Sequence, residues 1–190
     1  MWEPAQWETE FRAGLEYDAF LEKFATPQHR DRWKTVYDQL RLTDAQREML
    51  AGFTRRMHIL CVTGAWCGDC VRQCPIIQRI AEAAPMISYR LVDRDDRPDV
   101  QREVALNQGL RVPVFVFLSE DFHECGRYGD RVLAYYRQMA QDQLGPACPT
   151  GIVAPGSQLL QEATQQWLNE VERVQLMLRL SKRLRARHGD

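Results

Sequence analysis

The sequence lacks the features that mark membrane, secreted and nucleic-acid-binding proteins. No apolar run of about 18 residues occurs, so no membrane-spanning helix and no membrane partner are predicted. The N-terminal segment is acidic and has neither the basic start nor the apolar stretch of a signal peptide, so we expect a cytoplasmic location. The formal net charge of −1 gives no overall positive field, so nucleic acid is not expected as a partner.

Internal repeats and low-complexity segments are also absent, and the composition is that of a folded protein. Hydrophobic residues make up 45% of the chain and charged residues 27%. A chain of 190 residues favours one domain with additions over two full domains. We expect a helical extension over residues 1–56, an α/β domain over residues 57–144, and a linker with a C-terminal helix over residues 145–190.

The first 56 residues have helical apolar spacing throughout. One helical pattern covers Leu15–Leu21 and a second covers Arg30–Leu40. A third begins at Thr43, where Gln46 completes a capping box. This region is therefore predicted to be all helix.

From residue 57 onward, short apolar runs alternate with helical patterns. The expected strands are Met57–Val62, Ile87–Val92, Val112–Leu118 and Phe122–Tyr128. The expected helices are Cys67–Ala83, interrupted near Pro75, then Asp99–Asn107, and a last core helix that opens at Gly129-Asp130. This order predicts a central mixed sheet with helices against its faces.

A second helical region follows a Pro- and Gly-rich stretch at residues 145–157. Apolar residues there recur at spacings of three and four and form one stripe: Leu160, Ala163, Trp167, Val171, Val174 and Leu178. We expect the stripe to pack on the chain's own core. A dimer interface is the alternative, which leaves a homodimer possible. The basic end, residues 182–188, is expected to be a solvated helix terminus.

Six cysteines are present, and four of them cluster in one segment: Cys61, Cys67, Cys70 and Cys74. In a reducing compartment, clustered cysteines indicate redox chemistry or metal binding rather than structural disulfides. Cys67 and Cys70 stand three apart, after a strand and at the start of a helix. Because a helix N-terminus favours negative charge, we expect the Cys67 thiol to ionise more easily than a free thiol.

This arrangement predicts dithiol–disulfide exchange. A Cys67 thiolate attacks a substrate disulfide, and the more buried Cys70 resolves the mixed disulfide, leaving a redox-active Cys67–Cys70 disulfide. No further cofactor and no metal are expected. The implied partners are a disulfide-containing protein or small-thiol substrate and an unidentified electron donor.

The segment Trp66-Cys67-Gly68-Asp69-Cys70 resembles the active site of the thioredoxin family. Pro75 falls where that family kinks its active-site helix, Val112-Pro113 resembles its cis-proline, and Gly129 resembles its glycine before the last helix. The CGDC centre resembles a bacterial branch of the family. The resemblance covers residues 57–142 and implies a thioredoxin-like α/β fold.

The resemblance also implies roles for residues around the cysteine pair. Trp66 would cover the active site, and the backbone of Val112 beside Pro113 would bind an extended substrate segment. The alternatives are a core position for Trp66 and an edge-strand proline of no consequence. Gly68, between the two cysteines, is expected to tune their chemistry.

Two positions depart from the family's buried charges. Where the resemblance implies a buried aspartate and a lysine, this chain has Cys61 and Tyr89. The proton acceptor for Cys70 is thus left open among water, Asp69 and Tyr89.

Asp69 and Cys74 are further departures. Asp69 replaces the family's proline, and its carboxylate is expected to disfavour a thiolate at Cys67 and make the pair more reducing. The alternative is that Asp69 only caps the helix. Cys74 follows Cys70 on the same helix face and is expected to be a core residue. A second exchange partner or a metal ligand is the alternative.

Two other functions compete with disulfide reduction. The first is a redox-sensitive interaction module, in which the terminal helices hold a partner. The second is a metal or iron–sulfur site that uses the four clustered cysteines, although no second CxxC motif occurs.

Overall fold

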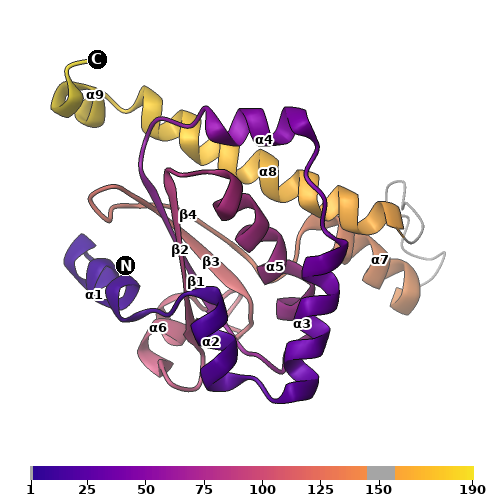
Figure 1. Cartoon of the computed structure of the whole chain (residues 1–190). Coiled ribbons are helices and arrows are strands. Elements are labelled where there is room, and N and C mark those ends of the chain that lie inside the picture. The colour runs from indigo at the N-terminus through magenta and orange to yellow at the C-terminus, as the bar shows by residue number, and fades with distance from the viewer. Residues whose placement is uncertain (1, 145–156) are drawn as a thin grey trace.

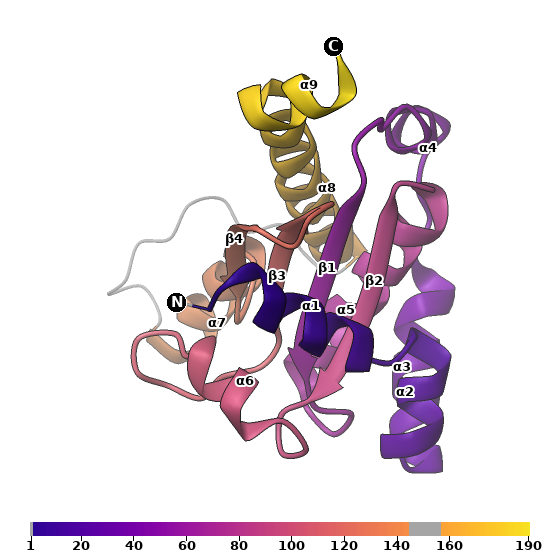
Figure 2. The same ribbon diagram turned by 90° about the vertical axis from the view of Figure 1, so that its left-hand side faces the viewer.

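A mixed four-stranded sheet forms the centre of the computed structural model, which describes residues 2–144 and 157–190 (Figures 1 and 2). In the order β2-β1-β3-β4, the strands are Ile87–Asp93, Met57–Thr63, Val114–Ser119 and Glu124–Gly129. Strand β1 pairs parallel with β2 and antiparallel with β3, which pairs antiparallel with β4. This confirms the predicted α/β class with a central mixed sheet.

Helices flank the sheet on both sides. Their bounds are α1 Pro4–Ala13, α2 Tyr17–Phe24, α3 Pro27–Gln39, α4 Asp44–Ala51, α5 Gly68–Ala83, α6 Pro98–Glu103, α7 Leu133–Leu144, α8 Ser157–Leu180 and α9 Lys182–His188. Figure 2 shows α1 and α6 in front of the sheet, with α5, α7 and α8 behind it. In the described part of the chain, no helix has the length and apolar character to cross a membrane.

The N-terminal region is mostly helical, with non-helical connections at residues 14–16, 25–26, 40–43 and 52–56. Helix α3 begins after Thr26, whose hydroxyl accepts a hydrogen bond from the His29 N–H, and the predicted Thr43–Gln46 capping box opens α4. The prediction of helix throughout is wrong at Leu15. That residue forms an isolated antiparallel bridge with Leu91, through N–H to oxygen distances of 2.9 and 2.8 Å. Pairing with the edge strand β2 therefore displaces the start of α2 to Tyr17.

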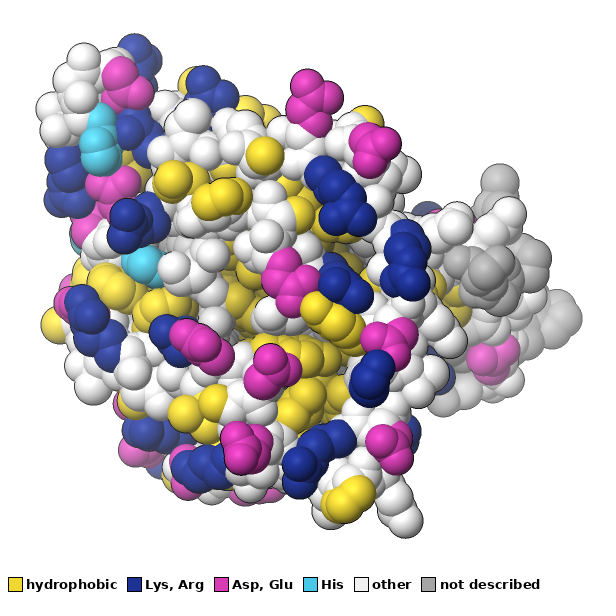
Figure 3. Space-filling model, in the orientation of Figure 1, with side chains coloured by type: hydrophobic (Ala, Val, Ile, Leu, Met, Phe, Trp, Pro, Cys, Tyr) yellow, Lys and Arg dark blue, Asp and Glu magenta, His cyan; other side chains and the backbone are white. Residues whose placement is uncertain are grey.

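One hydrophobic core joins the sheet to helices from both ends of the chain. Trp7, Trp33 and Trp167 come from α1, α3 and α8, and all three are fully buried in this core. The Trp167 ring lies 4.4 Å from that of Phe115 on β3. The apolar stripe of α8 thus packs on the chain's own core, as expected, and a dimer interface through that stripe is wrong. Over the face in Figure 3, acidic and basic side chains are interspersed.

Several element boundaries differ from the predictions because backbone geometry overrides the apolar pattern. Strand β4 begins at Glu124 rather than Phe122, whose φ of 61° is incompatible with a strand. Helix α6 ends at Glu103 because the following turn places Asn107 and Gln108 at φ 48° and 59°.

Two helices of the core domain also correct the predictions. Helix α7 starts at Leu133 rather than at Asp130, because the backbone of residues 130–132 bonds to a side chain of α5. Helix α5 runs from Gly68 to Ala83 with Pro75 inside it, so the predicted interruption near Pro75 is wrong. Residues 145–156 of the predicted linker, 145–157, lie outside the described residues, and Ser157 is the first residue of α8.

The basic C-terminal end is bound to the chain itself. In α9, Arg183 and Arg187 form ion pairs with Asp121, and the His188 ring lies 2.7 Å from a Glu120 carboxylate oxygen. These acidic residues form the turn between β3 and β4. Part of the basic run is therefore engaged within the fold rather than only solvated.

The Asp121 contacts predict that the docking of α9 depends on pH. Burial alone would raise the pKa of Asp121, but hydrogen bonds from Arg183 and Ser119 lower it to about 2. The stabilisation is therefore complete above the unfolded pKa near 3.8 and is lost as the pH falls toward 2. In urea titrations, the unfolding free energy of the wild type should fall more steeply between pH 4 and pH 2 than that of Asp121→Asn. Glu172→Gln is the control, and a wild-type slope shared by all three proteins would contradict the assignment.

Candidate active site

The active-site segment connects the end of strand β1 to the start of helix α5. Cys67 occupies the residue before the helix, with extended backbone angles of φ −74° and ψ 127°. Its N–H donates to the Gly64 carbonyl at 3.0 Å, and its carbonyl accepts from the Val71 N–H at 3.0 Å. The chain turn thus holds Cys67 at the positive end of the helix, as predicted from the sequence.

The two cysteines of the pair differ in access. Cys70 is fully buried, whereas 9% of the Cys67 surface is exposed. The Cys67 Sγ lies 3.6 Å from the carbonyl oxygen of Val112. The peptide bond between Val112 and Pro113 is cis, as predicted. The structure therefore brings the cysteine pair together with the Val112-Pro113 segment, which lies more than 40 residues later in the sequence.

Burial and mutual proximity affect the pKa of both thiols. The hydrogen bond with Cys70, followed by burial, raises the pKa of the Cys67 thiol. Burial raises the pKa of Cys70 well above its ordinary value. The direction of these shifts opposes the predicted easy ionisation of Cys67, because the neighbouring sulfur and the loss of solvent act against the helix end.

A buried group of thiol and hydroxyl side chains lies behind Cys70. The Cys74 Sγ is 3.7 Å from the Cys61 Sγ and 3.4 Å from the Thr63 hydroxyl. Tyr89 places its hydroxyl against Cys61 and Cys74, where it makes no hydrogen bond of ordinary geometry. Weakly polar groups thus fill the region where the family resemblance implies a buried ion pair.

Cys74 is a core residue, as expected, and is unsuited to exchange with Cys70. It is fully buried on α5, four residues after Cys70. Cβ atoms at this spacing in a helix lie about 5–6 Å apart, whereas a disulfide needs about 3.5–4.5 Å. Within the described ranges, no three His, Cys, Asp or Glu side chains are placed to hold a metal ion together.

Asp69 is paired with a cation that no sequence pattern predicts. Its carboxylate lies 2.5 Å from a guanidinium nitrogen of Arg131, from the segment before α7. Arg131 also contacts the buried Asp130 carboxylate at 2.9 Å. Asp69 does not occupy the cap position, which belongs to Cys67. Asp69 is therefore not the helix cap, and Arg131 compensates the charge through which Asp69 was expected to disfavour a thiolate at Cys67.

Two further residues that sequence reasoning missed position the site. The Trp33 indole N–H donates to the Ala65 carbonyl at 2.8 Å, in the turn before Cys67. The fully buried Gln73 side chain donates to the Asp130 carbonyl at 2.7 Å and accepts from the Val132 N–H at 3.1 Å. The position of Gln73 on the apolar face of α5 could have indicated this contact, because a buried amide needs hydrogen-bond partners.

Trp66 does not belong to the core. Half of its surface is exposed, and the Arg94 guanidinium lies 5.8 Å from its ring centroid. The core alternative for Trp66 is therefore wrong, and its role as a cover of the active site stays a prediction. Gly68 is exposed beside Cys67, and its expected tuning of the pair stays a prediction.

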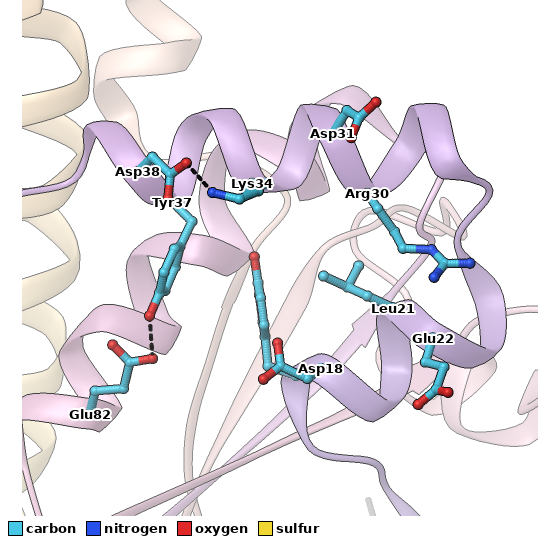
Figure 4. Close-up of a pocket in the computed structure, with 10 residues that line it drawn as sticks. Asp18, Leu21, Glu22, Arg30, Asp31, Lys34, Tyr37, Asp38 and Glu82 are labelled. Carbon is cyan, nitrogen blue, oxygen red and sulfur yellow. Dashed lines mark hydrogen bonds and ion pairs between the residues drawn. The ribbon is translucent and has the colours of Figure 1, made fainter.

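Other candidate groups lie apart from the pair. A pocket of about 490 Å³ between α2, α3 and the end of α5 is lined by charged residues and two tyrosines and contains no cysteine (Figure 4). There the Tyr37 hydroxyl donates to Glu82 at 2.7 Å, and Lys34 pairs with Asp38 at 2.5 Å. Burial raises the pKa of Cys125 to about 11, which disfavours its thiolate. Cys148 lies outside the described residues.

Comparison with known proteins identifies the family. A sequence model described as thioredoxin matches residues 14–142, including helices α2 to α4. The chain belongs to the thioredoxin family. Thioredoxin H-type 1 of Nicotiana tabacum is 28% identical over 102 residues, covering 53% of this chain and 75% of the relative. A thioredoxin H-type of Ricinus communis is 26% identical over 91 residues, covering 48% and 70%. These relatives support a thiol–disulfide oxidoreductase role at the level of the family.

Solved structures share the fold over nearly the whole chain. A Pseudomonas aeruginosa protein of unknown function aligns with a TM-score of 0.67 and 22% identity, over 90% of this chain and 98% of its own. An HIV epitope scaffold aligns with a TM-score of 0.60 and 17% identity, over 84% and 95%. At these identities the likeness concerns the thioredoxin fold with its added helices, and not the activity.

The close contact of Gly129 with the Pro113 loop generates a prediction. A Cβ at Gly129 would lie 2.5 Å from the Pro113 carbonyl oxygen, which is backbone and cannot move aside. Gly129→Ala should therefore lower the free energy of unfolding by about 1–3 kcal/mol and reduce the reactivity of Cys67. The matched control is Gly126→Ala, whose Cβ meets only the flexible end of Arg173 at 3.2 Å. Equal denaturant midpoints for the two variants would contradict the prediction.

Proposed function

We propose that this thioredoxin-family protein reduces protein disulfides in the cytoplasm through dithiol–disulfide exchange at Cys67 and Cys70. One observation carries the proposal. Cys67 lies at the N-terminus of α5, partly accessible and 3.6 Å from the Val112 carbonyl, with Cys70 fully buried behind it. An accessible attacking sulfur with a shielded resolving sulfur is the arrangement that this chemistry requires.

The exchange takes place in two steps. The Cys67 Sγ attacks one sulfur of the substrate disulfide, and the other substrate sulfur leaves and takes up a proton. The Cys70 Sγ then attacks the Cys67 Sγ, and the second substrate sulfur leaves as a thiol. The substrate gains two electrons and two protons, and the enzyme holds a Cys67–Cys70 disulfide that an external dithiol donor must reduce.

The backbone around Pro113 supports substrate binding. The Val112 carbonyl already faces the Cys67 sulfur, so an extended substrate segment that pairs with this backbone would place its disulfide at the attacking atom. The exposed Trp66 ring would cover the opposite side of the substrate.

Thiol ionisation favours a reductase over an oxidase. A strong oxidant is one whose reduced form is stabilised, for instance by an ionised thiol. Here the neighbouring Cys70 and burial raise the pKa of the Cys67 thiol, which opposes such stabilisation. Since Arg131 compensates Asp69, burial and the second sulfur carry this argument rather than the Asp69 charge.

A trapping experiment tests the exchange. In Cys70→Ser, the resolving sulfur is absent, so Cys67 should remain joined to its substrate as a mixed disulfide. Non-reducing electrophoresis and mass spectrometry of adducts identify the attached protein and the cysteine that carries it. Cys125→Ser is the control and should trap nothing. Absence of any adduct, together with no insulin-disulfide reduction by the wild type, would refute the proposed function.

Substitutions in the Asp69–Arg131 pair should shift the pKa of the Cys67 thiol in opposite directions. Asp69→Asn removes a carboxylate near Cys67 and leaves Arg131 paired only with Asp130, which should lower the pKa of the Cys67 thiol by roughly one unit or less. Arg131→Gln leaves the Asp69 carboxylate uncompensated and should raise it. The pH dependence of Cys67 alkylation by iodoacetamide measures both shifts. Shifts of the same sign in the two variants would contradict the pairing.

A further inference from the structure

Five arginines lie on the segments that carry the cysteine pair or adjoin it. They come from α3, α5 and three connecting segments, and they are Arg32, Arg72, Arg94, Arg111 and Arg131. We refer to these five residues as the arginine rim. The chain as a whole carries a net charge of −1, so a concentration of guanidinium groups at this one place is a local feature.

Contacts place the rim at the active site. Arg32 lies next to the first helical residue, since a Cβ at Gly68 would be 3.8 Å from its guanidinium nitrogen. Arg94 lies over the Trp66 ring and donates to the Leu110 carbonyl at 3.1 Å. Arg111 immediately precedes Val112 in the sequence.

The other two members are Arg72, on α5, and Arg131, which precedes α7 and contacts the first turn of α5. Arg131 pairs with Asp69, between the two cysteines in sequence. Arg72 is exposed one helical turn after Asp69, with its guanidinium 5.8 Å from the Tyr135 ring centroid.

Acidic neighbours compensate only part of this charge. Asp69 and the buried Asp130 pair with Arg131, Asp130 also contacts Arg111 at 3.1 Å, and Asp95 pairs with Arg94 at 3.2 Å. Among the described residues, no carboxylate lies within 4 Å of a guanidinium nitrogen of Arg32 or Arg72, and both side chains are exposed. The rim therefore presents an excess of positive charge to solvent.

Exposed apolar side chains lie within the same segments. The exposed fractions are 50% for Trp66, 47% for Leu110, 50% for Leu133 and 39% for Tyr136. Apolar and aromatic groups bordered by arginine are the composition that protein interfaces favour. A polypeptide, rather than a small thiol, fits a surface that extends from Leu110 to Tyr136.

We infer that the preferred substrates are polypeptide disulfides flanked by aspartate or glutamate, which the arginine rim attracts and orients. Guanidinium groups bind carboxylates through paired, charge-assisted hydrogen bonds. A local positive field also accelerates the encounter with an acidic partner. The inference rests on the proposed exchange at Cys67 and Cys70, and it names the class of substrate for that site.

Three disulfide-bridged peptides of equal length test the inference. They differ only in the residues flanking the disulfide, which are glutamate, glutamine or lysine. Pre-reduced wild-type protein should reduce the glutamate peptide about tenfold faster than the lysine peptide at low ionic strength. The ratio should shrink toward one in 0.5 M salt, where exposed charges are screened within about 4 Å. Glutathione disulfide, a small anionic substrate, should react more slowly than the glutamate peptide.

Variants assign the preference to the rim. Arg32→Glu with Arg72→Glu removes two cations that form no ion pair, so the fold should be kept, as circular dichroism can verify. This double variant should lose or reverse the preference while it still reduces the glutamine peptide. Arg47→Glu is the matched control, because Arg47 is an exposed arginine on α4, which precedes β1 at the end remote from Cys67.

The outcomes separate the inference from the proposed function. Equal reduction of all three peptides, a preference unchanged in the double variant, or faster reduction of glutathione disulfide would overturn the inference and leave the exchange chemistry standing. No reduction of any peptide would overturn the exchange chemistry itself.

Discussion

A buried hydrogen bond from the Trp33 indole to the Ala65 carbonyl fixes the turn on which the active site depends. That turn leads from β1 into α5 and sets where Cys67 stands relative to the helix end. Gln73 adds a second fixed point by tying α5 to residues 130–132. Loss of a buried hydrogen bond of this kind costs about 1–3 kcal/mol. The N-terminal helices therefore position the cysteine pair as well as complete the core.

The environment of the pair explains its expected direction of reaction. The buried charges that the family resemblance implies are replaced by Cys61, Cys74 and Tyr89. These side chains provide no charge to stabilise a thiolate at Cys70. Apolar or weakly polar groups in place of a buried ion pair need not reduce stability. At the N-terminus of α5, the charges of Arg131 and Asp69 compensate each other. Burial and the neighbouring Cys70 thus both raise the pKa of the Cys67 thiol.

The sequence predicts the parts of this site that depend on local pattern. Cys67, Cys70 and the strand–helix junction follow from spacing and apolar runs, and cis-Pro113 follows from the family resemblance. Contacts between distant segments were not predictable, because Asp69 and Arg131 stand 62 residues apart and Trp33 and Ala65 stand 32 apart. The expected easy ionisation of Cys67 did not allow for its burial or for the adjacent Cys70 sulfur, which both raise the pKa of its thiol.

The reduction potential of the Cys67–Cys70 couple tests the central claim most directly. Equilibration of the protein with a series of thiol–disulfide buffers, followed by alkylation and mass spectrometry, gives the oxidised fraction at each potential. A two-electron couple more negative than about −180 mV, the value for protein disulfide isomerase, is predicted. A more positive potential, or oxidation that does not join Cys67 to Cys70, would contradict the account of a buried, reducing pair.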